Sequence, residues 1–133
     1  MCALGTQNKT VFLIYPHLTE FNRGDIIEAA ITDTNVSLLC RIVGLPGENI
    51  EIQNKQIIIN GQPLKDNWGA MKDERNYPQN LSVRDNVQNV TIRVNQYYCL
   101  HDNRQQYTDS RLWGVVNKEM IRGKLWAIGM LGI

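Results

Sequence analysis

Short apolar runs separated by turn-forming residues recur along the whole chain, a pattern typical of β-strands. Such runs predict strands at residues 11–15, 26–31, 36–43, 49–53, 56–59, 90–94, 96–100 and 125–128. Asn60-Gly61 suits a type I′ hairpin turn, because both residues tolerate positive φ. No stretch sustains a 3.6-residue period, and residues 115–121 offer one helical turn at most. The pattern predicts an all-β fold, a partly closed barrel or sandwich.

The pattern changes at about residues 65–89, where charged and amide side chains replace β-branched ones. A stretch of this length without strand character predicts a long, exposed excursion from the sheets. Trp68 and Tyr77 are its candidates for anchoring side chains.

Length and charge narrow the classes of function. The 133 residues predict one domain, residues 1–133. The chain has 14 Lys and Arg against 13 Asp and Glu, so it lacks the basic field of a nucleic-acid-binding protein. No run of 18 apolar residues occurs that would predict a membrane-spanning helix.

Sequence motifs then point to a family. The boxes are residues 22–27 (NRGDII), 40–48 (CRIVGLPGE), 101–104 (HDNR), 109–114 (DSRLWG) and 123–128 (GKLWAI). In the second box, Gly44, Pro46 and Gly47 favour a tight reversal between two strands. In this order the boxes resemble those of type I signal peptidases, over about residues 1–128. The resemblance implies a serine protease fold on the extracytoplasmic face of the cell membrane, tethered by an N-terminal anchor that precedes Met1.

The resemblance also implies where the catalytic groups belong. In the family a serine attacks the peptide bond and a lysine accepts its proton. Here the serine position falls just before Met1, and Cys40 stands at the lysine position. A thiol cannot replace a neutral amine base. Tyr107 occupies the position of a small hydroxyl residue that supports the lysine, and we expect its phenol to fill the amine's space. His101 replaces a glycine, which predicts an altered backbone φ or a restricted cleft.

The role of Cys40 admits three interpretations. It is a small buried hydrophobe in the space of the lysine, the interpretation we favour, or a nucleophile assisted by His17 or His101. The third is a disulfide with Cys99 in an oxidising compartment. None of the three cysteines has Cys-x-x-Cys spacing, so we expect no metal site and no cofactor.

The remaining charged residues of the boxes keep the family's identities. We expect buried or half-buried carboxylate–guanidinium pairs that hold the cleft walls. These structural residues are Arg41, Asp102, Asn103, Arg104, Asp109, Ser110 and Arg111.

Two functions are compatible with these residues. The first, which we favour, is a non-catalytic relative that binds extended polypeptide in the retained cleft. The sequence is similar to inactive, pilus-associated proteins of Gram-positive bacteria, which implies pilin subunits or a sortase as partners. The second is an active type I signal peptidase that cleaves signal peptides from secreted preproteins.

Overall fold

The computed structural model describes residues 2–7, 10–15, 20–31 and 37–130, with side chains described within 20–31 and 37–125. Eleven strands form within these residues, together with one short α-helix and one 3₁₀ turn. The strands are β1 (Cys2–Gln7), β2 (Thr10–Tyr15), β3 (Ile26–Ala30), β4 (Ser37–Gly44), β5 (Asn49–Gln53), β6 (Gln56–Ile59), β7 (Gln62–Pro63), β8 (Val87–Thr91), β9 (Gln96–Leu100), β10 (Val116–Asn117) and β11 (Ile121–Met130). The helix is α1 (Ser110–Trp113), and the 3₁₀ turn is η1 (Lys118–Met120).

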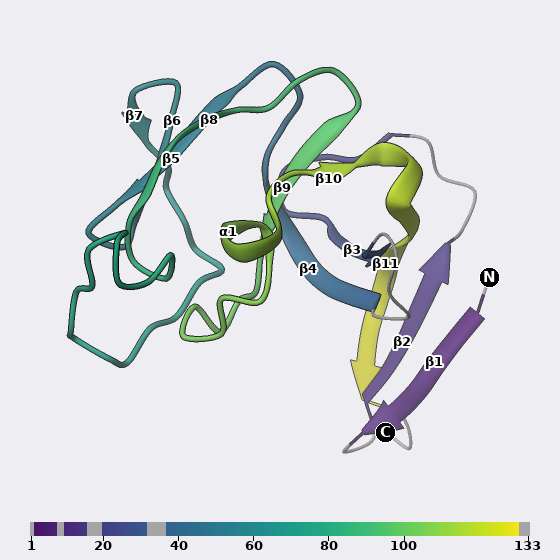
Figure 1. Ribbon diagram of the computed structural model, residues 1–133. Helices are drawn as coiled ribbons and strands as arrows, with labels where there is room; N and C mark the ends of the chain where they lie inside the picture. The colour runs from purple at the N-terminus through teal and green to yellow at the C-terminus, as the bar shows by residue number, and fades with distance from the viewer. Residues whose placement is uncertain (1, 8–9, 16–19, 32–36, 131–133) are drawn as a thin grey trace.

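The strands form two antiparallel sheets. The larger has the order β1-β2-β11-β3-β4-β9-β10, and the smaller has the order β7-β6-β5-β8. Figure 1 shows the smaller sheet on the left, the larger one on the right and α1 between them. The all-β prediction is confirmed, and the sheets do not close into a barrel. No helix within the described part is long and apolar enough to cross a membrane.

The smaller sheet follows from alternating isoleucines. Ile50, Ile52, Ile57 and Ile59 point to one face and are at most 8% exposed. Both predicted hairpins form, and the Asn60-Gly61 turn has φ values of 51° and 80°. Burial of these four side chains on one face fixes the register, because a slip by one residue would expose them.

A second cluster of buried hydrophobic side chains belongs to the larger sheet. Ile27, Ala29, Leu38, Ile42 and Cys99 are among its members, each at most 5% exposed. β3, β4 and β9 supply them, so the core lies under the strands that carry the sequence boxes.

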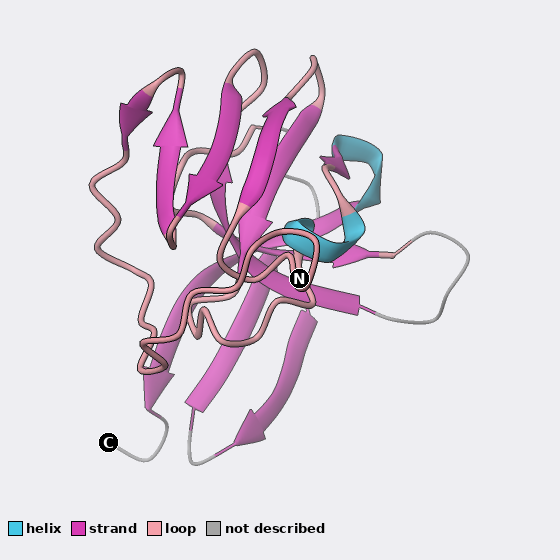
Figure 2. Cartoon of the chain, turned by 60° about the vertical axis from the view of Figure 1, so that its left-hand side comes forward, coloured by secondary structure: helices cyan, strands magenta, loops and turns pink. Residues whose placement is uncertain are grey.

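Some predicted boundaries were wrong. The strand expected at residues 90–94 is β8, Val87–Thr91, because the chain turns at Asn95 with φ 61°. The excursion accordingly ends before residue 87, and Figure 2 shows it as a long loop beside the strands. β1 and α1 were not predicted, and the closing strand is longer than expected. The single helical turn expected within residues 115–121 is η1.

The excursion is anchored by charged groups. Arg84 is 7% exposed and donates to Asp85 through Nε (2.9 Å) and Nη2 (2.8 Å), and to Asp73 through Nη1 (2.8 Å). The Arg84 guanidinium also lies 4.6 Å from the ring centroid of Tyr77. Tyr77 therefore anchors the loop, as predicted, through a cation–π contact.

Candidate functional site

The first two sequence boxes join at the end of β4. The backbone N–H of Gly24 donates to the Ile42 carbonyl, and that of Ile42 donates to the Asp25 carbonyl, each at 2.8 Å. Arg23 donates to both carboxylate oxygens of Glu48, at 2.9 and 2.6 Å. Gly47 has a φ of +88°, which only glycine adopts easily, and this value allows the reversal into β5. The turn thus connects β4 to β5 and holds the segment before β3.

Arg41 links the second box to the third. Its Nε and Nη2 donate to the two carboxylate oxygens of Asp102, at 2.9 and 2.7 Å, and its Nη1 donates to the Gly24 carbonyl at 2.7 Å. The guanidinium lies 5.5 Å from the ring centroid of Trp68, which brings the long loop to the same place. Trp68 therefore anchors the loop, as predicted.

Arg104 and Asn103 fix the start of the loop after β9. Arg104 donates to the His101 carbonyl at 2.7 Å and forms an ion pair with Asp66. Asn103 is exposed and forms an isolated β-bridge with Ala70. Arg104 therefore pairs with a carboxylate outside the sequence boxes, one that the motifs did not indicate.

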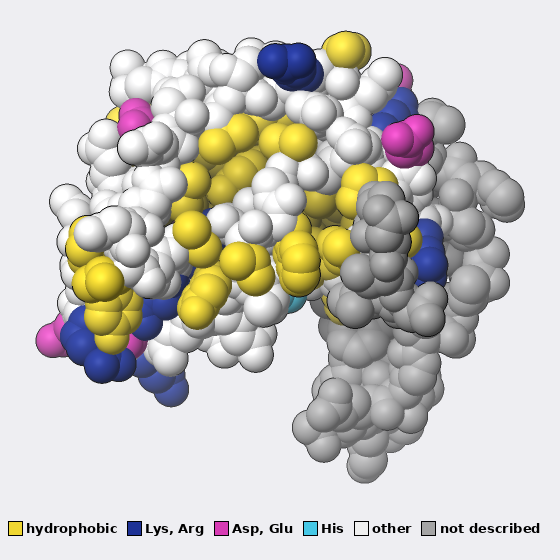
Figure 3. All heavy atoms as spheres, viewed as in Figure 1, with side chains coloured by type: hydrophobic (Ala, Val, Ile, Leu, Met, Phe, Trp, Pro, Cys, Tyr) yellow, Lys and Arg dark blue, Asp and Glu magenta, His cyan; other side chains and the backbone are white. Residues whose placement is uncertain are grey.

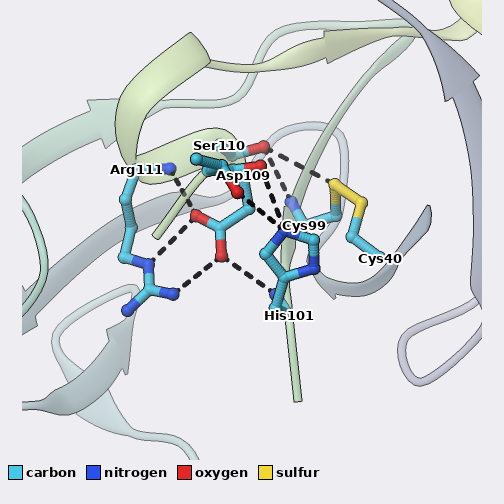
Figure 4. Close-up of a disulfide and its surroundings, with 7 residues drawn as sticks. Cys40, Cys99, His101, Asp109, Ser110 and Arg111 are labelled. Atoms are coloured by element: carbon cyan, nitrogen blue, oxygen red, sulfur yellow. Dashed lines mark hydrogen bonds and ion pairs between the residues drawn. A yellow bond between two sulfur atoms is a disulfide. The ribbon is translucent and has the colours of Figure 1, made fainter. Parts of the chain in front are cut away.

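Asp109 organises the fourth box and is fully buried. It caps α1 by accepting from the backbone N–H of Arg111 (3.0 Å), and it also accepts from that of His101 (2.9 Å). The Arg111 guanidinium donates to both carboxylate oxygens, at 3.0 and 2.7 Å. It further donates to the carbonyls of Arg84 and Arg104. Asp109 and Arg111 thus form a buried carboxylate–guanidinium pair of the kind that the sequence predicts, and Figure 4 shows it beside the cysteines.

Cys40 and Cys99 form a disulfide between β4 and β9, with their Cα atoms 5.7 Å apart. They are diagonal neighbours, because Ile42 pairs with Cys99. The hydroxyl of Ser110 accepts from the backbone N–H of Cys99 at 3.0 Å and lies 3.7 Å from its sulfur (Figure 4). Of the three interpretations of Cys40, the structure therefore supports the third, a disulfide with Cys99.

The nucleophile interpretation is wrong for the bridged protein, because a disulfide sulfur carries no thiolate. The favoured interpretation was right about burial, since Cys40 is 3% exposed, and wrong about a free thiol. His17 lies outside the described residues. No described group of three His, Cys, Asp or Glu side chains is arranged to hold a metal ion.

Two cavities lie beside Leu39 of β4, and the smaller one is also lined by Cys40. One, of about 140 Å³, is lined by Ile26, Leu39, Cys40, Arg41, His101 and Asp102. The other, of about 400 Å³, is lined by Ile31, Ser37, Leu38, Leu39, His101, Thr108 and Trp113. In Figure 3 hydrophobic side chains form a band across the middle of the face shown.

His101 borders both cavities, and the expected restriction of the cleft by its side chain stays a prediction. The backbone φ of His101 is not positive, so this residue does not adopt the left-handed conformation that favours glycine. The imidazole Nε2 lies 3.1 Å from the Thr108 carbonyl. Tyr107 is 39% exposed and lines neither cavity. The expectation that its phenol fills the amine's space stays a prediction. Cys40, at the position that the resemblance assigns to the lysine, is in the disulfide.

The described lining of these cavities contains no lysine. Lys124 pairs with Ile27 across β11 and β3, and Ile27 pairs with Cys40 across β3 and β4. Two strand spacings place Lys124 about 10 Å from Cys40. Its amine forms an ion pair with Asp25 at 3.2 Å.

Comparisons with known proteins agree with the sequence boxes and the fold. The family model described as "Signal peptidase, peptidase S26" matches residues 5–129. Signal peptidase I S of Bacillus subtilis is 32% identical over 109 residues, which are 80% of this chain and 58% of that protein. Signal peptidase I of Leptolyngbya laminosa is 30% identical over 128 residues, covering 87% of this chain and 58% of the relative.

A solved structure is also similar. The crystal structure of a signal peptidase I from Enterococcus faecalis superposes with a TM-score of 0.63 at 29% identity, covering 80% of this chain and 97% of that one. The chain belongs to the signal peptidase S26 family and has its β-sheet fold. It spans about three-fifths of the length of the curated relatives that it matches.

Proposed function

We propose that this protein is a non-catalytic member of the family that binds extended polypeptide. One observation carries the proposal: Cys40, at the position that the resemblance assigns to the general-base lysine, is in a disulfide with Cys99. A serine hydroxyl needs a nearby base to lose its proton, and a disulfide has no group that accepts one at neutral pH. Lys124 does not substitute for that base, because its amine is paired with Asp25.

The shape of β4 supports peptide binding. The register between β4 and β9 begins at Arg41 and Leu100, so Ser37–Cys40 extend beyond the part that β9 pairs with. An added strand can bind such a segment through main-chain hydrogen bonds, with its side chains in adjoining pockets. The two cavities that share Leu39 and His101 lie at this segment.

The cellular role follows from the resemblance to pilus-associated relatives. We propose that the protein assists pilus assembly on the extracytoplasmic face of a Gram-positive cell membrane, held there by an N-terminal anchor. Pilin subunits or a sortase would be its partners. An extended segment of such a partner has the chemistry that the β4 edge can bind.

An active signal peptidase is the second candidate, favoured by the similarity to relatives named signal peptidase I. That function requires a serine at the position before Met1 and a base other than Cys40.

Cleavage by the full-length protein separates the two candidates. Membranes containing it would be incubated with a secreted preprotein, beside the variant Cys40→Lys/Cys99→Ala, which restores the amine and removes the leftover thiol. We expect no cleavage by the unaltered protein, and cleavage by it would contradict the proposal. Cleavage by the variant alone would show that the missing base is the cause of inactivity.

Photo-crosslinking tests the binding half of the proposal. A photoreactive residue at Leu39, which borders both cavities, should form adducts with pilin subunits in cells that assemble pili. The same residue at Val94, which is 78% exposed and lines a different groove, is the matched control. Equal adducts at both positions, or none at Leu39, would contradict binding at β4.

A further inference from the structure

The two bridged sulfurs are inaccessible in the folded protein. Cys99 is 0% exposed and Cys40 is 3% exposed, and Cys40 lines the cavity of about 140 Å³. Thiol–disulfide exchange requires one sulfur to approach another directly, so burial blocks it. Attack by the active-site cysteine of a second protein on these buried sulfurs is therefore slow in the folded chain.

The position of the bridge in the chain limits when it can form. The cysteines are 59 residues apart, and β5, β6, β7 and β8 all lie between them. The bridge therefore closes a loop that contains the entire smaller sheet. Once β4 and β9 have paired and Ser110 has bonded to the N–H of Cys99, the sulfurs are enclosed.

We propose that this protein is a substrate of an extracytoplasmic thiol oxidase, which inserts the Cys40–Cys99 bond before the larger sheet closes. One cysteine thiolate attacks the oxidase disulfide, forms a mixed disulfide and releases one oxidase thiolate. The second cysteine, as thiolate, then attacks the sulfur of the first and displaces the other oxidase sulfur. The protein loses two electrons and two protons, and the oxidase disulfide becomes a dithiol.

A refolding experiment tests the order of events. The full-length protein carrying Cys2→Ser would be reduced, unfolded and diluted into buffer. An oxidase with a low-pKa Cys-x-x-Cys disulfide is added either at dilution or after refolding. Maleimide labelling under denaturing conditions then reports the free thiols. We expect bridging at dilution to be roughly tenfold faster or more than bridging after refolding. Equal rates would overturn the proposed order.

A cell experiment tests the need for the enzyme. The exported full-length protein would be labelled in cells with and without their extracytoplasmic thiol oxidase. We expect free thiols at Cys40 and Cys99 only in the cells that lack it, and added cystine should restore the bridge. Equal bridging in both cells, or free thiols in both, would overturn the proposal. If the reduced chain does not refold in the first experiment, the cell experiment alone tests the proposal.

Discussion

Asp109 and Arg111 form a buried, two-point ion pair with side chains 0% and 2% exposed. Asp109 also caps α1 and accepts from the backbone of His101, so one carboxylate holds the helix and the loop after β9. If the charge of Asp109 is removed, the buried Arg111 guanidinium keeps only uncharged carbonyl acceptors. Such an uncompensated charge is costly.

We therefore expect Asp109→Asn to lower the free energy of unfolding by about 3–5 kcal/mol, measured by urea denaturation. Asp102→Asn is the matched control, because Asp102 pairs with Arg41 but its side chain is 42% exposed. That change should cost about 0–1 kcal/mol. Similar losses for the two variants would contradict the structural role of Asp109.

Glu48 should make the free energy of unfolding depend on pH in the acidic range. Burial raises the pKa of Glu48, but hydrogen bonds from Arg23 and the Leu45 N–H outweigh it, so the pKa lies below the ordinary 4.5. The unfolded chain then takes up the proton at higher pH than the folded protein does. The contribution is fully present above about pH 4.5 and is lost as the pH falls through the folded pKa.

Urea unfolding of the wild type and Glu48→Gln between pH 7 and pH 3 measures this contribution. The stability difference between them should shrink as the pH falls. Since Asp66 and Asp85 also have lowered pKa values, only the difference isolates Glu48. A constant difference would show that the Arg23 pair does not shift this titration.

Two adjacent tyrosines provide a contrast. The Tyr98 hydroxyl is buried without a hydrogen-bond partner among the described residues, and burial raises the pKa of this phenol. Tyr98→Phe removes the unpaired hydroxyl, so we expect unchanged stability or a gain of about 1 kcal/mol. Burial raises the pKa of the Tyr97 phenol, and hydrogen bonding from the Phe21 backbone opposes this rise, so Tyr97→Phe should cost about 1 kcal/mol. Thermal unfolding measures both, and a larger loss for Tyr98→Phe would contradict the structure.

The bridge should contribute substantially to stability. A cross-link between residues 59 apart restricts the unfolded chain by about 4 kcal/mol in the loop-entropy account. The variant Cys40→Ala/Cys99→Ala should therefore unfold at lower urea concentration by roughly that free energy, plus the effect of two small cavities. Cys2→Ala, outside the bridge, is the control and should change little. Equal midpoints for the two variants would contradict the role of the bridge.

The sequence predicted most of this architecture, because its signals are local. Alternating isoleucines and Asn60-Gly61 specify the β5–β6–β7 meander, and the boxes locate the charged pairs. α1 also had a local signal, since Asp109 is a good N-cap residue. The β8 boundary was missed because Val94 continues the alternation, although the chain has already turned toward Asn95.

The pairings across long separations could not be predicted in this way. No local pattern places Asp66 beside Arg104 or Cys99 diagonal to Cys40. The second contact requires the β4–β9 register, which depends on the whole larger sheet. The outward position of Tyr107 likewise depends on the loop held by Asp109 and Arg111.

Disulfide mapping of the exported, full-length protein tests the central claim most directly. Trypsin digestion without reduction separates residues 24–41, which contain Cys40, from residues 94–104, which contain Cys99. Mass spectrometry should find these two peptides as one cross-linked species that splits on reduction. Two separate peptides with free thiols at Cys40 and Cys99 would contradict the account.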